Sequence, residues 1–207
     1  MPILPRFQEI MDRLEPGQRV SLNELDSKLL LKEYSVPVVE ERVVHSEAEA
    51  QAAAKALGFP VVAKGFGTGL GHKSDLGLVR VAIRDQTELA AAYNTLSEAG
   101  GPDLEGILIQ QHVRGQREFL AGLFRDPVFG AVVMFGLGGV YTEALADTAL
   151  GLTPLDQQTA LSMLGEIKSA SLLGRFRGEP APSRDEMARI LTGLSNLGLE
   201  HPEIAEI

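Results

Sequence analysis

No cysteine occurs among the 207 residues of the chain. Its absence excludes disulfide-stapled folds, zinc sites built on thiolates and catalytic cysteines. Positive charge is scarce as well, because 19 Lys and Arg residues stand against 28 Asp and Glu residues, which gives a net charge of −9. An acidic chain without a basic block is expected to bind neither nucleic acid nor an anionic membrane.

Long apolar runs are missing too. The N-terminal stretch carries charges at Arg6, Glu9, Asp12 and Arg13, so it lacks the apolar core of a signal peptide. The longest uncharged run, 127–142, contains four glycines. It is shorter than the roughly 20 residues that a membrane-spanning helix needs. We therefore expect a cytoplasmic protein.

Helical and extended patterns are mixed along the chain. Helices are predicted at 6–14, from Ser21 to about Tyr34, after Ser46, and at 86–98, 156–168 and 184–198. Strands are predicted at 61–64, 78–83, 107–113, 118–124 and 131–135. The hairpin-like spacing of the middle strands favours an α+β (mixed α/β) fold over a strictly alternating parallel one.

Short polar motifs predict where two of these helices begin. Ser21 with Glu24, and Ser46 with Glu49, have the spacing of a capping box, in which side chains satisfy free backbone N–H groups. Gly58 is expected to end the second of these helices, because glycine readily adopts a positive φ.

Glycine is concentrated after the strand predicted at 61–64, at Gly65, Gly67, Gly69 and Gly71. Glycine lets successive N–H groups point together at an anion, and Lys64 adds a positive charge, so the loop is a candidate phosphate site. A flexible hairpin turn explains the same composition, and both interpretations stay open.

Neither of the two common nucleotide-binding motifs is present in this loop. A Walker A loop needs glycine directly before Lys-Ser, whereas His72 separates Gly71 from Lys73. The dinucleotide fingerprint fails because Leu70 occupies the third glycine position. A phosphate site here would be of another kind.

His72 is the candidate for chemistry in this loop. An imidazole can act as a nucleophile toward phosphorus, as a base or as a metal ligand. No second histidine lies nearby, so we expect no metal site there. We expect Asp75 to orient the imidazole. A solvated loop histidine is the alternative interpretation.

Two later strands end in segments that suit a ligand. The strand at 107–113 ends in polar residues that can offer their backbone to an adenine edge. Glu118 is placed to accept a ribose hydroxyl or to help hold a metal, unless it is simply solvated. Gly-Leu-Gly-Gly at 136–139 indicates a close approach to a ligand or another chain, or a tight strand–loop contact.

Several segments in a fixed order resemble one family. They are S-K-L-L-L-K-E-Y-S-V-P-V (27–38), G-F-P-V-V-A-K (58–64), G-H-K-S-D-L-G (71–77), I-L-I-Q-Q-H-V (107–113), R-E-F-L-A-G (117–122), D-P-V-F-G-A-V-V-M-F-G-L-G-G-V (126–140) and R-G-E-P (177–180). Over about 20–207 the chain resembles the ATP-grasp subunit or domain of ADP-forming acyl-CoA synthetases, of the acetate–CoA ligase type. Succinyl-CoA synthetase β subunits are more distant relatives.

The resemblance implies an ATP-grasp fold, in which two lobes enclose a nucleotide cleft. Residues 20–109 would form the first lobe, with the glycine-rich phosphate loop, and 110–207 the second. Residues 1–19 would add a helical segment that packs on the second lobe. The implied ligands are ATP or ADP, with Mg²⁺.

The resemblance also assigns roles to single residues. Lys64 matches the strand lysine that binds the nucleotide phosphates. The phosphate hairpin matches Gly71, His72 and Lys73, and His72 matches the second phosphorylated histidine of the family. The hinge that reads adenine, largely through its backbone, matches Gln110, Gln111, His112 and Val113. Glu118 matches the acidic residue that faces the nucleotide.

The implied reaction is reversible: acyl-CoA, ADP and phosphate give a carboxylic acid, ATP and CoA. A CoA- and acyl-binding α-type partner, as a subunit or a domain, would form an acyl phosphate and pass the phosphoryl group to a histidine of its own. His72 would then relay the group to ADP. A hetero-oligomer is therefore expected.

The sequence departs from the family pattern at three points. Gln111 stands where glutamate is usual, and Gly151 where a basic residue precedes L-x-P-L. The chain stops at Ile207, before the D-x-N-P segment that supplies Mg²⁺ ligands in the family, so those ligands are expected outside 1–207. These departures favour an alternative, a non-catalytic or regulatory ATP-grasp module. An ATP-grasp carboxylate–amine ligase is a third possibility, which His72 argues against.

Overall fold

The computed structural model describes residues 4–12, 18, 20–67, 76–115, 117–139 and 142–207. The chain forms two compact units, and neither is a single stretch of sequence. The N-terminal unit consists of Gln8–Lys28 and Val38–Arg114. The C-terminal unit consists of Met1–Phe7, Leu29–Pro37 and Gly115–Ile207.

Both units combine helices with antiparallel sheets, so the predicted α+β fold is confirmed. The sequence placed the boundary between the lobes at 109/110, whereas the contacts divide the chain at Arg114 and Gly115. They also group Leu29–Pro37 with the C-terminal unit. Among the described residues, no helix is both long and apolar enough to cross a bilayer.

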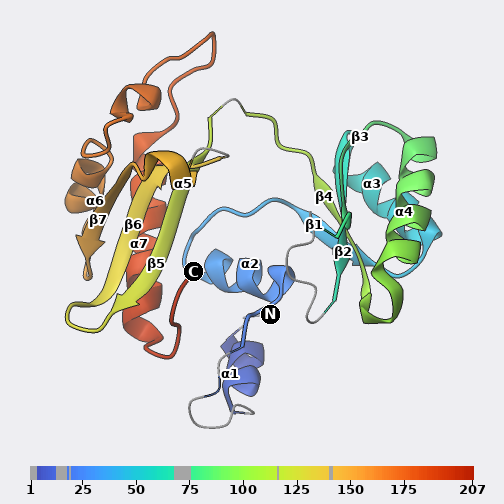
Figure 1. The fold of residues 1–207 in the computed structure, drawn as a ribbon, viewed down its shortest axis with the longest axis horizontal. Coiled ribbons are helices and arrows are strands. Elements are labelled where there is room, and N and C mark those ends of the chain that lie inside the picture. The colour runs from blue at the N-terminus through green and yellow to red at the C-terminus, as the bar shows by residue number, and fades with distance from the viewer. Residues whose placement is uncertain (1–3, 13–17, 19, 68–75, 116, 140–141) are drawn as a thin grey trace. The chain divides into compact units, whose positions relative to one another are not determined.

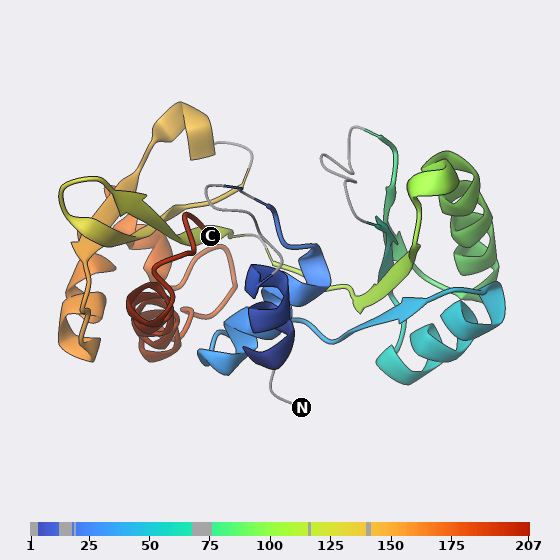
Figure 2. The same cartoon turned by 90° about the horizontal axis from the view of Figure 1, so that it is seen from below.

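The N-terminal unit is built on a four-stranded antiparallel sheet (Figure 1). Its strands are β1 (Glu41–Val44), β2 (Val61–Phe66), β3 (Val79–Ile83) and β4 (Gly106–Gln111), in the order β1-β4-β2-β3. The helices α3 (Glu47–Leu57) and α4 (Gln86–Gly100) belong to this unit, and the one-turn helix η1 (Gly101–Asp103) follows α4. The first half of α2 (Glu24–Glu33) belongs to it as well. Figures 1 and 2 show α3 and α4 on the same side of the sheet.

Alternation along the strands decides which side chains meet these helices. Val61, Ala63 and Ile109 belong to the apolar cluster that α3 and α4 share with the sheet. Their neighbours along the strands point to the opposite face, because successive strand side chains alternate. Lys64 lies on that opposite face, together with Gln110.

The helix ends follow the predicted chemistry with one correction. Ser46 accepts a hydrogen bond from the Glu49 N–H at 3.2 Å, as predicted, and Gly58 follows α3 with a φ of 82°. The helix α2 (Glu24–Glu33) begins later than predicted. Its first turn is capped by Asn23, whose Oδ1 accepts from the Asp26 N–H at 2.9 Å, so the predicted Ser21 cap is wrong.

The base of the glycine-rich loop is an antiparallel hairpin. Lys64 is paired with Val79 across β2 and β3, and the Gly65 N–H donates to the Leu78 carbonyl at 2.8 Å. The strand predicted at 78–83 is therefore confirmed as the second arm of the hairpin. Residues 68–75, the tip of the loop, lie outside the described residues.

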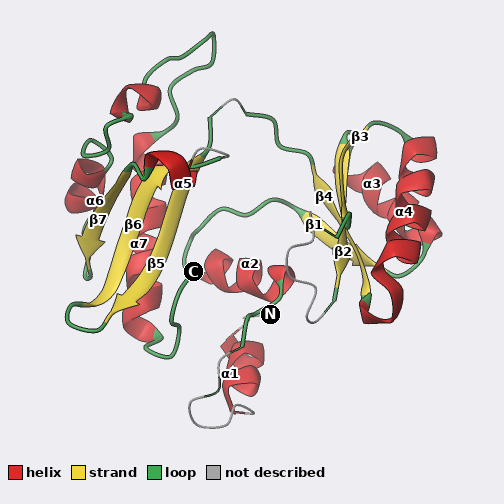
Figure 3. Ribbon diagram, viewed as in Figure 1, coloured by secondary structure: helices red, strands yellow, loops and turns green. Residues whose placement is uncertain are grey.

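The C-terminal unit has a three-stranded antiparallel sheet (Figure 3). Its strands are β5 (Phe119–Asp126), β6 (Gly130–Leu137) and β7 (Thr148–Leu152), in that order. Its helices are α5 (Thr142–Leu145), α6 (Gln157–Met163), the short η2 (Ala170–Leu173) and α7 (Arg184–Glu200). The sequence predicted all of these except β7, α5 and η2.

Contacts near the ends of the chain complete this unit. Leu123 and Ile207 exchange backbone hydrogen bonds of 3.0 and 2.8 Å, so the last residues pair with the β5 edge of the sheet. The helix α1 (Leu4–Asp12) carries Phe7, which is buried. The Phe7 ring meets His201 edge to face, with 5.0 Å between the ring centroids.

Candidate functional site

A network of charged side chains lies on the sheet face that α3 and α4 leave uncovered. The Lys64 ammonium is 2.8 Å from Oε1 of Glu24, in the first turn of α2. Lys28, one turn further along α2, donates to the same oxygen at 2.7 Å. Two ammonium groups from different elements therefore converge on one carboxylate oxygen.

Lys28 is held by two further acceptors. Its Nζ donates to Oε2 of Glu41 on β1, and to Oε1 of Gln110 on β4 at 3.3 Å. The Glu41 side chain is only 6% exposed. An ammonium group has three N–H donors, so Glu24, Glu41 and Gln110 together satisfy Lys28.

The network shifts the pKa values of Glu24 and Lys28. Burial raises the pKa of Glu24, but hydrogen bonds from Lys28 and Lys64 lower it by more and bring it from 4.5 to about 2. Burial lowers the pKa of Lys28, but hydrogen bonds to Glu24 and Glu41 raise it above the usual value. Glu24 is therefore ionised and Lys28 protonated at neutral pH.

In the predicted hinge, Gln110 to Val113, two backbone N–H groups already donate hydrogen bonds within the chain. The Gln111 N–H donates to the Glu40 carbonyl at 3.1 Å, and the His112 N–H to the Pro60 carbonyl at 3.3 Å. Val113 is 65% exposed, and its N–H and C=O make no hydrogen bond within the described part of the chain. Val113 therefore keeps its place as a candidate for backbone contacts with a ligand, and its role in reading adenine stays a prediction. The Gln110 side chain has a role that the sequence did not indicate, as an acceptor for Lys28.

Glu118 is exposed, directly precedes β5 and lies against the Gly-Leu-Gly-Gly motif. Its carbonyl accepts from the Gly138 N–H at 2.8 Å. A Cβ at Gly138 would lie 3.0 Å from the carbonyl carbons of both Glu118 and Phe119. At Gly136 a Cβ would lie 2.6 Å from the Asp147 carbonyl oxygen. The glycines therefore serve close packing within the chain, which favours the strand–loop interpretation of this motif.

The predicted chemical centre falls in the loop that the structure does not describe. Gly71, His72, Lys73 and Asp75 all lie outside the described residues, so their roles stay predictions. Within the described ranges, no three His, Asp or Glu side chains gather as metal ligands.

Gly151 stands where the family pattern has a basic residue, and its surroundings in this chain leave no room for a side chain. The resemblance implied that a phosphate-facing cation is missing at this position. A Cβ on Gly151 would lie 2.5 Å from the Met163 sulfur and 2.9 Å from Cδ2 of Leu155. A side chain here would point into the packing between β7 and α6. Glycine at 151 is therefore explained by close packing.

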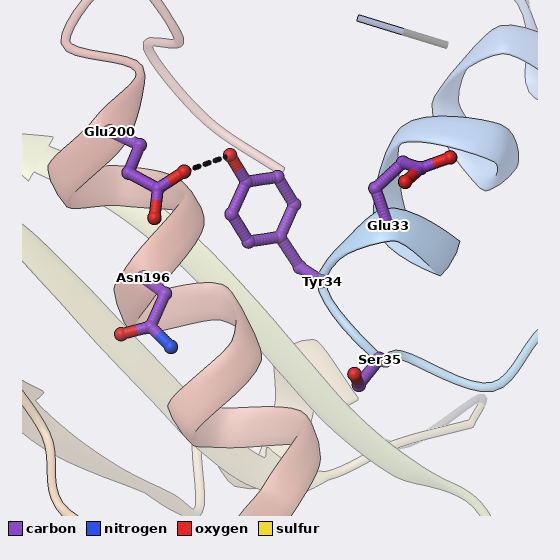
Figure 4. Close-up of a pocket in the computed structure, with 5 residues that line it drawn as sticks. All are labelled: Glu33, Tyr34, Ser35, Asn196 and Glu200. Carbon is purple, nitrogen blue, oxygen red and sulfur yellow. Dashed lines mark hydrogen bonds between the residues drawn. The ribbon is translucent and has the colours of Figure 1, made fainter. Parts of the chain in front are cut away.

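A separate pocket lies between the end of α2 and α7, within the C-terminal unit (Figure 4). Glu33, Tyr34, Ser35, Asn196 and Glu200 line it. The Tyr34 hydroxyl donates to Oε2 of Glu200 at 2.7 Å, and burial with this hydrogen bond raises the pKa of Tyr34. None of the predicted site residues lines this pocket.

The sequence analysis missed Lys28 and Glu41 and used Glu24 only as a cap. One local signal was available, because Glu24 and Lys28 have the i, i+4 spacing of a helical ion pair. The links to β1, β2 and β4 join residues up to 82 positions apart, which no local pattern reveals.

Comparison with known proteins gives the same family for nearly the whole chain. Residues 13–207 match the ATP-grasp domain family. The chain is 35% identical to the β subunit of acetate–CoA ligase [ADP-forming] I of Pyrococcus furiosus, covering 100% of this chain and 91% of that subunit. It is also 35% identical to acetate–CoA ligase [ADP-forming] I of Archaeoglobus fulgidus, but spans only 30% of that protein.

Solved structures agree with this family. The dinucleotide-forming acetyl-coenzyme A synthetase 1 of Candidatus Korarchaeum cryptofilum, solved with coenzyme A and Ca-AMPCP, has a TM-score of 0.88 and 37% identity. That match covers 96% of this chain and 89% of the korarchaeal one. Another structure of that enzyme contains Mg-AMPPCP, with a phosphohistidine segment that points towards its nucleotide site.

The predicted ATP-grasp fold is thereby confirmed, as is the family resemblance drawn from the motifs. Similarity at this level extends over the described part of both units and over the stretch that contains the glycine-rich loop. The chain therefore belongs to the ATP-grasp family, among the β subunits and β-type domains of the ADP-forming acetate–CoA ligases.

Proposed function

We propose that the chain is the nucleotide-binding, phosphoryl-transferring part of an ADP-forming acyl-CoA synthetase. The reaction is acyl-CoA, ADP and phosphate to carboxylic acid, ATP and CoA, and it is reversible. The observation that carries the proposal is the similarity to the Pyrococcus furiosus β subunit, which extends over the whole of this chain. Members of this family act on different carboxylic acids, so we assign no particular acid to this chain.

The described residues supply the electrostatic part of this function. Lys64 lies on β2, directly before the glycine-rich loop, and we assign it to the nucleotide phosphates. This assignment is supported by the Glu24 oxygen, an anionic oxygen that accepts from both Lys28 and Lys64. Val113 is assigned to the adenine edge and Glu118 to the ribose. Gly71 and Lys73 are assigned to the phosphates through the resemblance.

His72 is assigned to the phosphoryl relay. In the synthetic direction an imidazole nitrogen of His72 attacks phosphorus on the partner's phosphohistidine, and a P–N bond forms as the partner's P–N bond breaks. A β-phosphate oxygen of ADP then attacks the same phosphorus, and the bond to His72 breaks. A neutral imidazole is a competent nucleophile near pH 7. Positive charge from lysines would offset the charge on the transferring phosphoryl oxygens.

The proposal includes a partner and a metal. The Pyrococcus furiosus relative is named as a β subunit, and we propose a CoA- and acyl-binding α-type partner for this chain. We propose that ADP and ATP bind as Mg²⁺ complexes, where the metal would neutralise phosphate charge. None of the roles assigned to side chains depends on that metal.

Nucleotide binding tests the first half of the proposal. Calorimetry with ADP and Mg²⁺ is expected to give a saturable isotherm for the unaltered chain. Lys64→Met is expected to weaken that binding at least about tenfold, since a hydrogen bond to a charged group is lost. Lys55→Met, at an exposed position of α3, is the matched control and is expected to bind like the unaltered chain.

Phosphorylation tests the second half. With ATP, Mg²⁺ and an α-type subunit, the chain is expected to carry acid-labile, alkali-stable phosphate on His72, mapped by mass spectrometry. His72→Asn should abolish this label and leave ADP binding in place. Nucleotide binding without any label on His72 would favour the non-catalytic or regulatory alternative.

A further inference from the structure

The contact between Glu24 and two lysines has the geometry of an occupied anion site. Lys28 and Lys64 approach the same Glu24 oxygen at 2.7 and 2.8 Å, from α2 and β2. These are the distances of charge-assisted hydrogen bonds. Both lysines are mostly shielded, with 20% and 23% of their side chains exposed. Two such donors on one anionic oxygen would suit a phosphate oxygen equally well.

Lys28 is oriented before any ligand arrives. Glu41 and Gln110 accept hydrogen bonds from two of the three N–H donors of Lys28. These two residues lie opposite each other on the paired strands β1 and β4. The remaining donor points at Glu24. A cation fixed in this way loses little conformational freedom on binding, so it favours a ligand at the Glu24 position.

The two carboxylates of the network differ in how readily they can be exchanged. The Glu41 side chain is 6% exposed, whereas that of Glu24 is 22% exposed and lies in the first turn of α2. Glu24 is therefore the carboxylate of the pair that lies nearer to solvent, where an incoming anion can reach its lysines. If the Glu41 carboxylate moved away, the charge of Lys28 would stay partly buried without this partner, which costs free energy.

We propose that Lys28 is a second phosphate-binding lysine, and that Glu24 fills the subsite between Lys28 and Lys64 until a nucleotide phosphate oxygen displaces it. Glu24 is thus an internal competitor of the phosphate for both cations. The inference rests on the proposed function, because it needs Lys64 to meet the phosphates of a bound nucleotide.

The two roles predict opposite effects on affinity. Glu24→Gln removes the competing charge and keeps the shape, so ADP is expected to bind about three- to tenfold more tightly. Loss of Lys28 removes a donor, and ADP is expected to bind at least about tenfold more weakly. Adenosine has no phosphate, so its affinity should stay within about twofold in both cases.

The variants are chosen to keep the fold. Lys28→Met alone would leave Glu41 buried and unpaired, so it is combined with Glu41→Gln, which keeps the network neutral. The matched control is Lys55→Met with Glu47→Gln, the same charge change at exposed positions of α3. Thermal unfolding of each variant checks folding, and calorimetry with ADP, ATP and adenosine measures binding.

The outcomes separate this inference from the proposed function. Tighter ADP binding by Glu24→Gln and weaker binding by Lys28→Met/Glu41→Gln, both absent with adenosine, support it. Weaker binding by Glu24→Gln would show Glu24 to be a positioning residue and overturn the inference. If Lys64→Met weakens ADP binding while the other variants match their control, the inference alone fails. If the unaltered chain binds no nucleotide, both fail.

Discussion

Gly193 shows how closely a single position can be constrained. It lies in the middle of α7, and a Cβ there would fall on the carbonyl oxygen of Tyr34, well inside contact distance. The obstacle is backbone and cannot rotate away. We expect Gly193→Ala to lower the free energy of unfolding by about 3 kcal/mol, measured by denaturant titration.

Gly115 provides the matched control. A Cβ added at Gly115 would have the Arg117 carbonyl oxygen as its nearest neighbour, at 3.8 Å, which is an ordinary van der Waals distance. Gly115→Ala is expected to change the unfolding free energy by less than about 0.5 kcal/mol. Equal effects of the two substitutions would contradict the packing of Tyr34 on α7.

Glu24 makes a pH-dependent contribution to stability. Its pKa is about 2 in the folded chain, against an ordinary value of 4.5. A carboxyl group with a lowered folded pKa stabilises the fold above the unfolded pKa, and the contribution is lost as pH falls through the folded one. We therefore expect the stability difference between the unaltered chain and Glu24→Gln to shrink from about pH 4.5 toward pH 2.

Chemical unfolding at a series of pH values measures this difference. Glu166→Gln, at an exposed position, serves as the control and should differ from the unaltered chain by a nearly constant amount. A difference for Glu24→Gln that does not vary between pH 6 and about pH 3 would show that the lysines do not stabilise this carboxylate.

At the scale of elements, Arg117 fixes a long connection between η2 and α7. Its guanidinium donates to the carbonyls of Leu172 and Gly174 at 2.8 and 2.7 Å, and to that of Pro180. The side chain is 8% exposed. We expect Arg117→Ala to destabilise the chain by about 3 kcal/mol, because three carbonyl groups lose a buried donor.

Hydrogen exchange tests whether Arg117 holds this connection more directly than a measurement of stability does. Amide protons in 172–180 should exchange faster in Arg117→Ala than in the unaltered chain. Arg189→Ala, in which an exposed arginine of α7 is removed, is the control. Unchanged exchange in that segment would mean that Arg117 does not hold it.

Close packing beside the strand β7 explains why residue 151 is a glycine. Because Met163 and Leu155 fill the space beside it, we expect Gly151→Arg to destabilise the chain by about 2 kcal/mol. It should leave ADP affinity unchanged within about twofold. A gain in ADP affinity would restore the idea of a missing phosphate-facing cation. Calorimetry and denaturant unfolding of the one variant measure both effects.

Local chemistry explains which elements the sequence could predict. The start of α3 was predicted because its Ser46 cap acts within three residues. The strand β7 was missed because Gly151 weakens its pattern, and because its pairing with β6 is a tertiary contact. In the site, Lys64 was predicted from its place before the glycines. Its partner Glu24 is 40 residues away, and only the fold brings the two together.

At the scale of the whole molecule, the two compact units differ from the predicted lobes, again because tertiary contacts decide them. The predicted lobes, 20–109 and 110–207, are contiguous, whereas the contacts group Leu29–Pro37 with 115–207. Tyr34 shows why, since its carbonyl lies against Gly193 and its hydroxyl donates to Glu200 (Figure 4). Contacts of this kind are invisible in composition or periodicity. The boundaries of independently folding parts are therefore best tested with fragments.

Fragments of the chain should fold according to these contacts. The segment 38–114 holds all of the apolar cluster around α3 and α4, so it is expected to melt cooperatively alone. The segment 115–207 lacks Leu29–Pro37 and leaves its site on α7 uncovered. We expect its melting to become sharper and higher when Leu29–Pro37 is attached through a flexible linker. The gain should be lost when the attached segment carries Tyr34→Ala. Circular dichroism measures all four melting curves, and equal curves with and without the attached segment would contradict this division.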